Sequence, residues 1–241
     1  MRLSTKSALA VALGLAIAAP ASVANMVVYP MTTKIGNEQD GVTQIQIFSK
    51  TDKVQYVKTR VAKIVNPAMP DEHEVDVSAD AGLVVSPQRL VLTPGSNRTV
   101  RIISDSVPTE EIVYRVYFEP VNAPADAIEV ESADGPAVKS QIGVSLIWGA
   151  LVRVLPDNRN LQATLSADGS KLHNGGNVRI GVLEVGHCTS GSESDCKWTE
   201  VQKSVYPGQS LSIDSANRTG SVVLRYQTTA DPAPKTMKLA P

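Results

Sequence analysis

Residues that could carry catalytic or metal chemistry are few in this chain of 241 residues, and they lie far apart. The three histidines are His73, His173 and His187, and they lack the His-x-His or His-Glu-x-x-His spacing that presents several ligands to one metal. A Ser-x-x-Lys tetrad at 194–197 overlaps the segment between two cysteines, where no helix could project the serine and the lysine together. The sequence therefore predicts no enzyme, no metal site and no cofactor.

The first residues have the pattern of an export signal. Arg2 and Lys6 precede the apolar run 8–18, and the small residues 22–24 follow it, as in a secretory signal peptide. A membrane anchor needs roughly 20 apolar residues, whereas Pro20 interrupts this run. We expect residues 1–24 to direct export of the protein and to be removed by cleavage after Ala24.

The only two cysteines are Cys188 and Cys196. An even cysteine count in an exported protein is typical of a disulfide, and this one would close a short loop. A metal site would need more cysteine or histidine nearby than His187 alone, and a redox pair usually has the spacing Cys-x-x-Cys. The plain structural disulfide is the favoured interpretation of the three.

Charge and length restrict the possible partners and the number of domains. Lys and Arg number 23 against 24 Asp and Glu, so the chain lacks the basic field that binding to a nucleic acid backbone requires. The length is sufficient for two domains of sandwich size. Nucleic acid is therefore not an expected partner.

The elements that follow the signal peptide are predicted to be strands. β-Branched residues alternate between turn pairs such as Asp40-Gly41, Pro94-Gly95 and Asp168-Gly169, which is the pattern of an all-β protein. Strands are expected at 42–48, 55–65, 82–85, 99–104, 112–119 and 141–154. Because an immunoglobulin-like sandwich takes about 100 residues, we expect two in tandem, 25–155 and 156–241.

The segment 121–139 interrupts this rhythm. Pro124 and Pro136 lie in it and Pro120 at its edge, among several acidic residues. A long loop of this kind is either functional or disordered, and the sequence leaves both possibilities open.

The longest β-like run is 141–154, with the sequence QIGVSLIWGALVRV. Side chains of a strand alternate between its two faces, so one face would carry Ile142, Val144, Leu146 and Trp148. A central strand that packs these residues against its own core is as consistent with the pattern as a binding strand is.

The first domain resembles the periplasmic pilus chaperones of the chaperone-usher pathway. The resemblance rests on Val27-Val28-Tyr29-Pro30, on the stretch from Leu83 to Ile102 with its Pro94-Gly95 turn and Arg101, on 114–121 and on 140–156. It covers nearly the whole first domain, whereas the second domain matches only loosely.

This resemblance implies a fold and a function. The fold is two immunoglobulin-like domains in a boomerang arrangement. The function is to bind pilus subunits in the periplasm and to deliver them to an outer-membrane usher. The seventh strand of the first domain is donated to a subunit that lacks a strand, with Ile142, Val144, Leu146 and Trp148 at the donor positions.

The sequence departs from the common pattern where the family anchors the subunit's C-terminal carboxylate. Met26 replaces the usual Arg, Leu151 replaces the usual Lys, and Leu155 replaces an interdomain Arg. Arg153 would lie on the same strand face as Leu151, and a guanidinium binds a carboxylate through two hydrogen bonds. We expect Arg153 to replace the anchor, and the pattern is closer to the divergent, alternative type of chaperone than to the common type. A solvated side chain or an interdomain ion pair would explain Arg153 too.

Two further expectations concern partners. An exported structural or adhesive sandwich protein is the alternative function, in which the same strand would be core only. For the chaperone, an apolar strand left exposed in the free protein predicts weak self-association.

Overall fold

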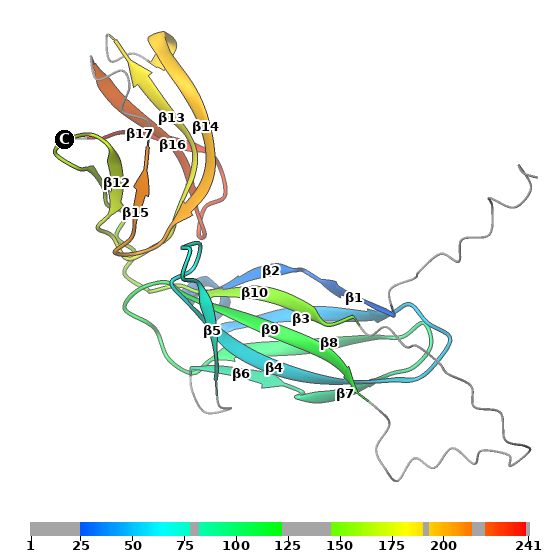
Figure 1. The fold of residues 1–241 in the computed structure, drawn as a ribbon. Coiled ribbons are helices and arrows are strands. Elements are labelled where there is room, and N and C mark those ends of the chain that lie inside the picture. Colours follow the sequence, from blue (N-terminus) through cyan, green and yellow to red (C-terminus); the bar gives the residue numbers. More distant parts are fainter. Residues whose placement is uncertain (1–24, 78–81, 122–145, 190–192, 214–219, 240–241) are drawn as a thin grey trace, which may run out of the picture.

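The computed structural model of the chain describes residues 25–77, 82–121, 146–189, 193–213 and 220–239. Strands form nearly all of its secondary structure, with two single 3-10 turns, η1 (Asn37–Gln39) and η2 (Glu193–Asp195). Within these ranges there is no helix with the length and apolar character to cross a membrane. The predicted all-β class is confirmed, and Figure 1 shows two sandwich-like domains set at an angle to each other.

Two facing sheets make up the first domain. One has the strand order β1 (Met26–Tyr29), β3 (Val42–Ser49), β8 (Asn97–Ser104) and β6 (Leu83–Ser86). The other has the order β2 (Thr32–Ile35), β10 (Trp148–Val154), β9 (Ile112–Val121), β4 (Gln55–Val65) and β5 (His73–Asp76), with β7 (Arg89–Leu92) also paired to β4. Alternate residues of these strands form one continuous core that includes Met26, Ile45, Val57, Val116, Phe118 and Val152.

The N-terminal strand passes from one sheet to the other within a few residues. β1 pairs antiparallel with β3 in the first sheet, whereas β2 pairs parallel with β10 in the second. Only Pro30 and Met31 separate the two strands, and proline, which has no N–H to donate, suits such a break. This change of sheet determines how much of β10 has a partner.

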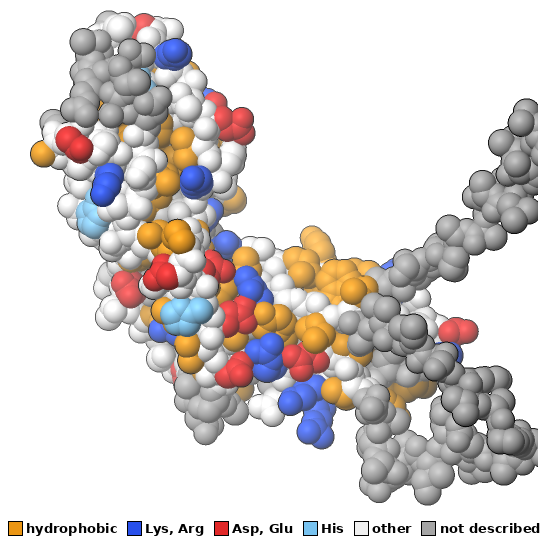
Figure 2. Space-filling model, in the orientation of Figure 1, with side chains coloured by type: hydrophobic (Ala, Val, Ile, Leu, Met, Phe, Trp, Pro, Cys, Tyr) orange, Lys and Arg blue, Asp and Glu red, His pale blue; other side chains and the backbone are white. Residues whose placement is uncertain are grey.

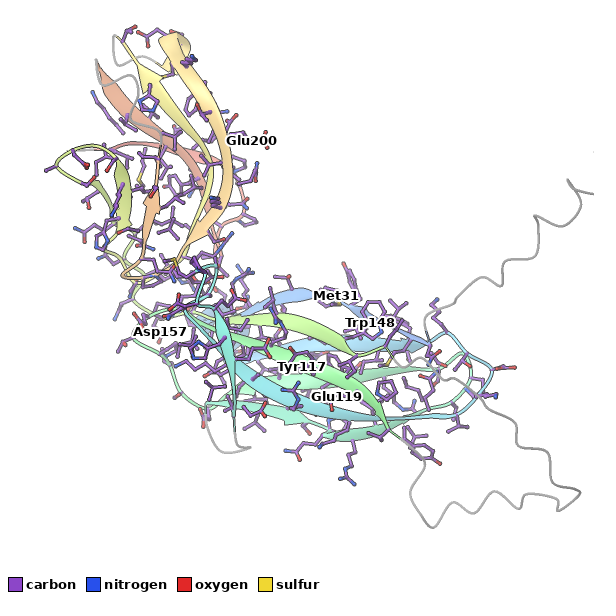
Figure 3. The ribbon with its side chains drawn as sticks, viewed as in Figure 1. Met31, Tyr117, Glu119, Trp148, Asp157 and Glu200 are labelled. Carbon is purple, nitrogen blue, oxygen red and sulfur yellow. A yellow bond between two sulfur atoms is a disulfide. The ribbon has the colours of Figure 1, made fainter. Side chains whose placement is uncertain are left out.

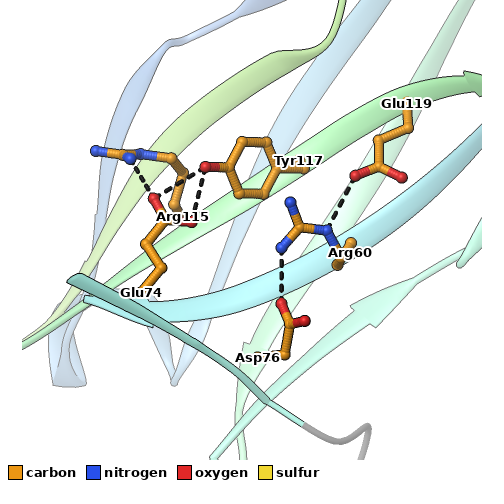
Figure 4. Close-up of polar contacts among 6 residues, drawn as sticks. All are labelled: Arg60, Glu74, Asp76, Arg115, Tyr117 and Glu119. Carbon is orange, nitrogen blue, oxygen red and sulfur yellow. Dashed lines mark hydrogen bonds and ion pairs between the residues drawn. The ribbon is translucent and has the colours of Figure 1, made fainter. Parts of the chain in front are cut away.

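The edge strand β5 is held by charged groups on the outer face of its sheet (Figure 4). Arg60 of β4 lies between Asp76 of β5, at 2.7 Å, and Glu119 of β9, at 3.0 Å. Its guanidinium also lies 4.1 Å from the centroid of the Tyr117 ring, and the Tyr117 hydroxyl donates to Glu74 of β5. Charged residues on an edge oppose pairing with other chains, so this edge is protected.

The second domain also has two sheets. One consists of β11 (Ala163–Leu165), β12 (Lys171–Asn174) and β15 (Ser210–Ser212). The other has the order β14 (Cys196–Val205), β13 (Ile180–Cys188), β16 (Ser221–Thr228) and β17 (Lys235–Leu239). Their core includes Leu172, Ile180, Val182, Val205 and Leu224.

The predicted disulfide is confirmed. Cys188 ends β13 and Cys196 begins β14, and the two residues are cross-strand partners joined by an S–S bond. The described residues hold one cluster with metal-ligand geometry, which consists of these cysteines and Asp195. Because both sulfurs are in the disulfide, neither is a thiolate that could bind a metal.

Most strand predictions agree with the structure, and the differences lie at ends and edges. The strands expected at 42–48, 55–65, 82–85, 99–104 and 112–119 are β3, β4, β6, β8 and β9. β9 continues to Val121, whereas the sequence places this residue in the loop, and the rest of that loop lies outside the described residues. The strand expected at 141–154 begins only at Trp148: Leu146 and Ile147 are not in a strand, and 141–145 are not described.

Candidate binding site: the edge of β10 and the cleft between the domains

β10 has a partner on only part of one edge. Its whole length, from Trp148 to Val154, pairs with β9, whereas β2 covers only 151–154. β1, which comes before β2 in the chain, belongs to the opposite sheet and therefore covers nothing here. Among the described strands, none pairs with 148–150 on the β2 side, and the backbone there is available to an added strand.

The direction of the backbone groups on this open edge follows from the ladder. The N–H of Leu151 donates to the carbonyl of Met31, and the N–H of Leu155 donates to the carbonyl of Ile35. Because successive N–H groups of a strand point to opposite neighbours, the N–H of Gly149 points to the same side. That side has no described partner strand at this position.

The side chains of β10 change from buried to exposed toward its beginning. Ala150, Val152 and Val154 are in the core, and Trp148 is half-buried and packs against it. Two residues earlier, Leu146 exposes 46% of its surface, and Ile147 exposes 57%. The strand that fills this domain's own core thus leads directly into an exposed apolar segment.

Other apolar side chains lie beside this segment. Tyr29 and Met31, at the junction of β1 and β2, are exposed, and Figure 2 shows hydrophobic side chains gathered where these strands approach the start of β10. Figure 3 places Met31 and Trp148 on the same edge of the domain. A contiguous apolar surface of this kind is typical of an interaction site.

At its other end β10 faces the second domain. Leu151 packs with Ile64 and Val113 of the first domain and with Tyr206 of the second. Arg153, whose side chain is only 16% exposed, lies 3.5 Å from the Tyr206 hydroxyl through its Nε atom. One face of β10 therefore lines the cleft between the domains.

A buried carboxylate lies at the centre of this cleft. The Glu111 side chain is fully buried, and it accepts hydrogen bonds from the Thr229 hydroxyl at 2.6 Å and from the backbone N–H of Arg179 at 2.9 Å. Its own N–H donates to the carbonyl of Asn177 at 2.9 Å. The Nε atom of Arg153 is 3.9 Å from the same carboxylate. Buried carboxylates need such donors to be tolerated.

Polar contacts at the rim complete the connection between the domains. The ammonium group of Lys34 donates to the carbonyl of Ala230 at 2.7 Å, and Arg159 forms an ion pair with Glu38 at 2.6 Å. The Arg159 hydrogen bond lowers the pKa of Glu38. These contacts place the two domains in a defined relation.

Three cations line one cavity of this cleft. The cavity measures about 280 Å³, and Lys34, Arg153 and Arg179 contribute to its wall, with threonines and Gln227 around them. Burial lowers the pKa of Arg179, and the nearby charge of Arg153 lowers it further. Positively charged groups that lower one another's pKa in a partly buried cavity favour the binding of an anionic ligand.

The structure brings some of the predicted site residues together and leaves others untested. Leu146 and Trp148 lie at the open edge, and Arg153 lies in the cleft, whereas Ile142 and Val144 lie outside the described residues. Met26, at the position of the family's usual Arg, is buried in the core.

Sequence reasoning missed three residues of the cleft, Lys34, Glu111 and Arg179. Glu111 follows Glu110 at the start of a predicted strand, and nothing in that pattern distinguishes the buried carboxylate from the exposed one. Lys34 and Arg179 come from elements in different domains, so their proximity is visible only in the fold.

Comparison with known proteins identifies the family. No family model matches the chain. A protein of Escherichia coli that is named as a CFA/I fimbrial subunit is 33% identical over 193 residues, which is 78% of this chain and 79% of that protein. A solved class 5 fimbriae chaperone, CfaA, is 29% identical with a TM-score of 0.73, over 90% of this chain and 100% of that one.

A second similar solved structure has the same fold. It belongs to a chaperone–tip adhesin complex in the biogenesis of CFA/I fimbriae, and it is 30% identical with a TM-score of 0.71, over 90% of this chain and 100% of that one. The match spans both sandwich domains. The chain therefore belongs to the class 5, alternative-type pilus chaperones, which are non-enzymatic periplasmic chaperones of the chaperone-usher pathway.

Proposed function

We propose that this protein binds pilus subunits by donor-strand complementation and delivers them to an outer-membrane usher. The observation that carries the proposal is the open edge of β10 at 148–150, next to the exposed apolar residues Leu146 and Ile147. An immunoglobulin-like subunit that lacks a strand has an unpaired edge and an open apolar groove. β10 and the residues before it offer what such a subunit lacks.

Two kinds of contact would form the complex. Backbone groups on the open edge of β10 would pair with the subunit's edge, and Ile142, Val144, Leu146 and Trp148 would fill its groove. At about 25 cal/mol per Å² of apolar surface, a few such side chains contribute several kcal/mol before ordering losses. The main-chain hydrogen bonds along the added strand would contribute the rest of the affinity.

Arg153 is the proposed anchor of the subunit's C-terminal carboxylate. It lies at the opposite end of β10 from the donor segment, in the cavity that Lys34 and Arg179 also line. Its contacts with Tyr206 and Glu111 are long, at 3.5 and 3.9 Å, so a carboxylate at hydrogen-bonding distance would be a stronger partner. The carboxylate would fix the register of the added strand, which main-chain pairing alone leaves free to slip.

The test is co-expression in a bacterial periplasm with a pilus subunit from the same gene cluster. Wild-type protein is expected to yield a soluble one-to-one complex. Leu146→Glu should abolish it, because a charge would enter the subunit's apolar groove. Val75→Glu is the matched control, since Val75 is exposed to a similar degree, 48%, on the edge strand β5 away from the site.

The outcomes separate the donor strand from the anchor. If the subunit's solubility does not depend on this protein, the proposed capture of that subunit by donor-strand complementation is wrong. If Leu146→Glu abolishes the complex and Arg153→Ala does not, the donor strand stands and the anchor is wrong.

We also propose that export removes residues 1–24 and that the free protein self-associates weakly through its apolar surface. Tyr29, Met31, Leu146 and Ile147 are exposed together in the single chain, and a second copy would cover them. Sedimentation over a concentration series should show reversible dimers, and Leu146→Glu should reduce them. A monomer at every concentration would contradict self-association and leave subunit binding untouched.

A further inference from the structure

We infer that the carboxylate anchor is shared between the domains: Arg179 of the second domain binds the same carboxylate as Arg153 of the first, and Gly181 positions the Arg179 guanidinium. This inference rests on the proposed function. It assigns to the second domain a direct part in recognising the subunit.

The Arg179 side chain lies across the face of β13, over Gly181. Its Nε atom donates to the Ser204 hydroxyl at 2.8 Å, and a Cβ atom built on Gly181 would lie 2.8 Å from its Nη2 atom. Ser204 and Gln227 are the cross-strand partners of Gly181 on either side. A side chain at position 181 would therefore occupy the space of the guanidinium, which sits where it does because the residue is glycine.

This location directs Arg179 toward the same cavity as Arg153. Both residues line the cavity, as does Gln227, and Lys34 approaches it from β2. The backbone of Arg179 is fixed separately, because its N–H donates to the buried carboxylate of Glu111. The main chain of Arg179 is thus held by Glu111 of the first domain, and its guanidinium is held by Ser204 of the second.

The charges of the cleft favour one more anion. Glu111 is the negative group buried beside Arg153 and Arg179, and its hydrogen bonds go to the neutral donors of Thr229 and of the Arg179 backbone. The two guanidinium groups are close enough that the charge of Arg153 lowers the pKa of Arg179. A carboxylate between the two groups would relieve that repulsion and accept hydrogen bonds from both.

A ligand that contacts both domains must also match their relative position. The carboxylate could be the subunit's terminal group or an acidic side chain close to its C-terminus, and both share the same chemistry. Replacing the terminal carboxylate by an amide, with the acidic side chains unchanged, distinguishes these two sources.

The probe is a synthetic peptide of the last ~20 residues of the subunit encoded beside this chain, long enough to add one strand. It is made with a free C-terminal carboxylate and with a C-terminal amide, and each is titrated into the full mature protein. Wild type is expected to bind the carboxylate form about tenfold more tightly. The amide form serves as an internal reference for folding and for strand pairing.

Arg179→Gln should bring the two affinities to within about twofold, and Arg179→Lys should restore part of the difference. Gly181→Ala should reduce the preference as well, although every charge is retained, because the methyl group displaces the guanidinium. Arg225→Gln is the matched control, since Arg225 pairs with Glu184 and lies over the Trp198 ring on the same sheet.

Two results, the first and the third below, would overturn the inference, and the second would keep it with a different group as the source of the carboxylate. An undiminished preference for the carboxylate in Arg179→Gln would place the anchor in the first domain alone. Equal binding of both forms by wild type, with loss on replacing an acidic side chain of the peptide, would identify that side chain as the ligand. A reduced preference in Arg225→Gln equal to that in Arg179→Gln would show a general charge effect. Failure of the wild type to capture the intact subunit is a different result, which counts against the proposed function.

Discussion

The Glu111 carboxylate accepts a hydrogen bond from the backbone N–H of Arg179 at 2.9 Å, so the two domains are joined through a main-chain group that every substitution at position 179 except proline retains. Glu111 directly precedes β9, and Arg179 directly precedes β13. One hydrogen bond therefore joins the residues that directly precede β9 in the first domain and β13 in the second. The relative position of the domains and the cavity between them both depend on this contact.

Substitution of Glu111 should weaken the whole molecule. Glu111→Ala leaves the Arg179 N–H and the Thr229 hydroxyl without their acceptor, and we expect the free energy of unfolding to fall by roughly 2–4 kcal/mol. Urea denaturation measures this change. Glu110→Ala, at the exposed neighbouring carboxylate, should change stability by less than about 0.5 kcal/mol. Equal effects of the two substitutions would contradict the structural role of Glu111.

Tyr114 should make the protein less stable at alkaline pH. Burial, with a contribution from the Asp105 charge, raises the pKa of its hydroxyl above the usual value of 10.0. The folded protein then holds the phenolic proton at a pH where the unfolded chain releases it, so the contribution of Tyr114 to stability is constant below about pH 10 and falls as the pH rises above it. Tyr114→Phe should remove that part of the decline.

The measurement is the free energy of unfolding of wild type and Tyr114→Phe at about pH 8 and about pH 11. The difference between the two proteins should change with pH in the direction of a relatively more stable variant at the higher value. A constant difference would show that Tyr114 titrates alike in the folded and unfolded chains.

The disulfide should stabilise the second domain without affecting subunit binding. It joins residues separated by 8 positions, and closing a loop of this length contributes about 2–3 kcal/mol by the loop-entropy model. The paired substitution of Cys188 and Cys196 by alanine should lower stability by that amount. Because β13 starts beside Glu111 and ends at Cys188, the bridge lies at the far end of that strand from the cleft. Loss of subunit capture by a still-folded variant would contradict this separation.

The sequence predicted the strands of the first domain well where alternation is long and regular. β4 was predicted with the bounds that the structure gives it, Gln55 to Val65, and its β-branched residues alternate over Val57, Thr59 and Val61. The short strands β5 and β7 were missed, whereas the equally short β6 was predicted because it is a run of apolar and β-branched residues. β5, with the sequence HEVD, contains a single apolar residue and carries no such signal. β5 is also held in part by charged contacts to Arg60 and Tyr117, which a hydrophobic pattern does not reveal.

The candidate site divides in the same way. The apolar segment around Leu146 and the placement of Arg153 on the face of Leu151 follow from strand periodicity. The open edge of β10 does not, because it depends on β1 and β2 belonging to different sheets. Arg179 and Glu111 enter the site from positions 68 residues apart, and only packing of the two domains brings them together.

The central claim is that a strand of the pilus subunit adds to the open edge of β10, and amide hydrogen exchange at Gly149 tests it most directly. In the free protein this N–H points to a side with no described partner strand, whereas the N–H of Leu151 donates to Met31. We predict that exchange at Gly149 is fast in the free protein and at least about tenfold slower in the complex with its partner, while exchange at Leu151 changes little. Unchanged exchange at Gly149 in a stable complex would mean that the pilus subunit binds elsewhere and that β10 is a core strand only.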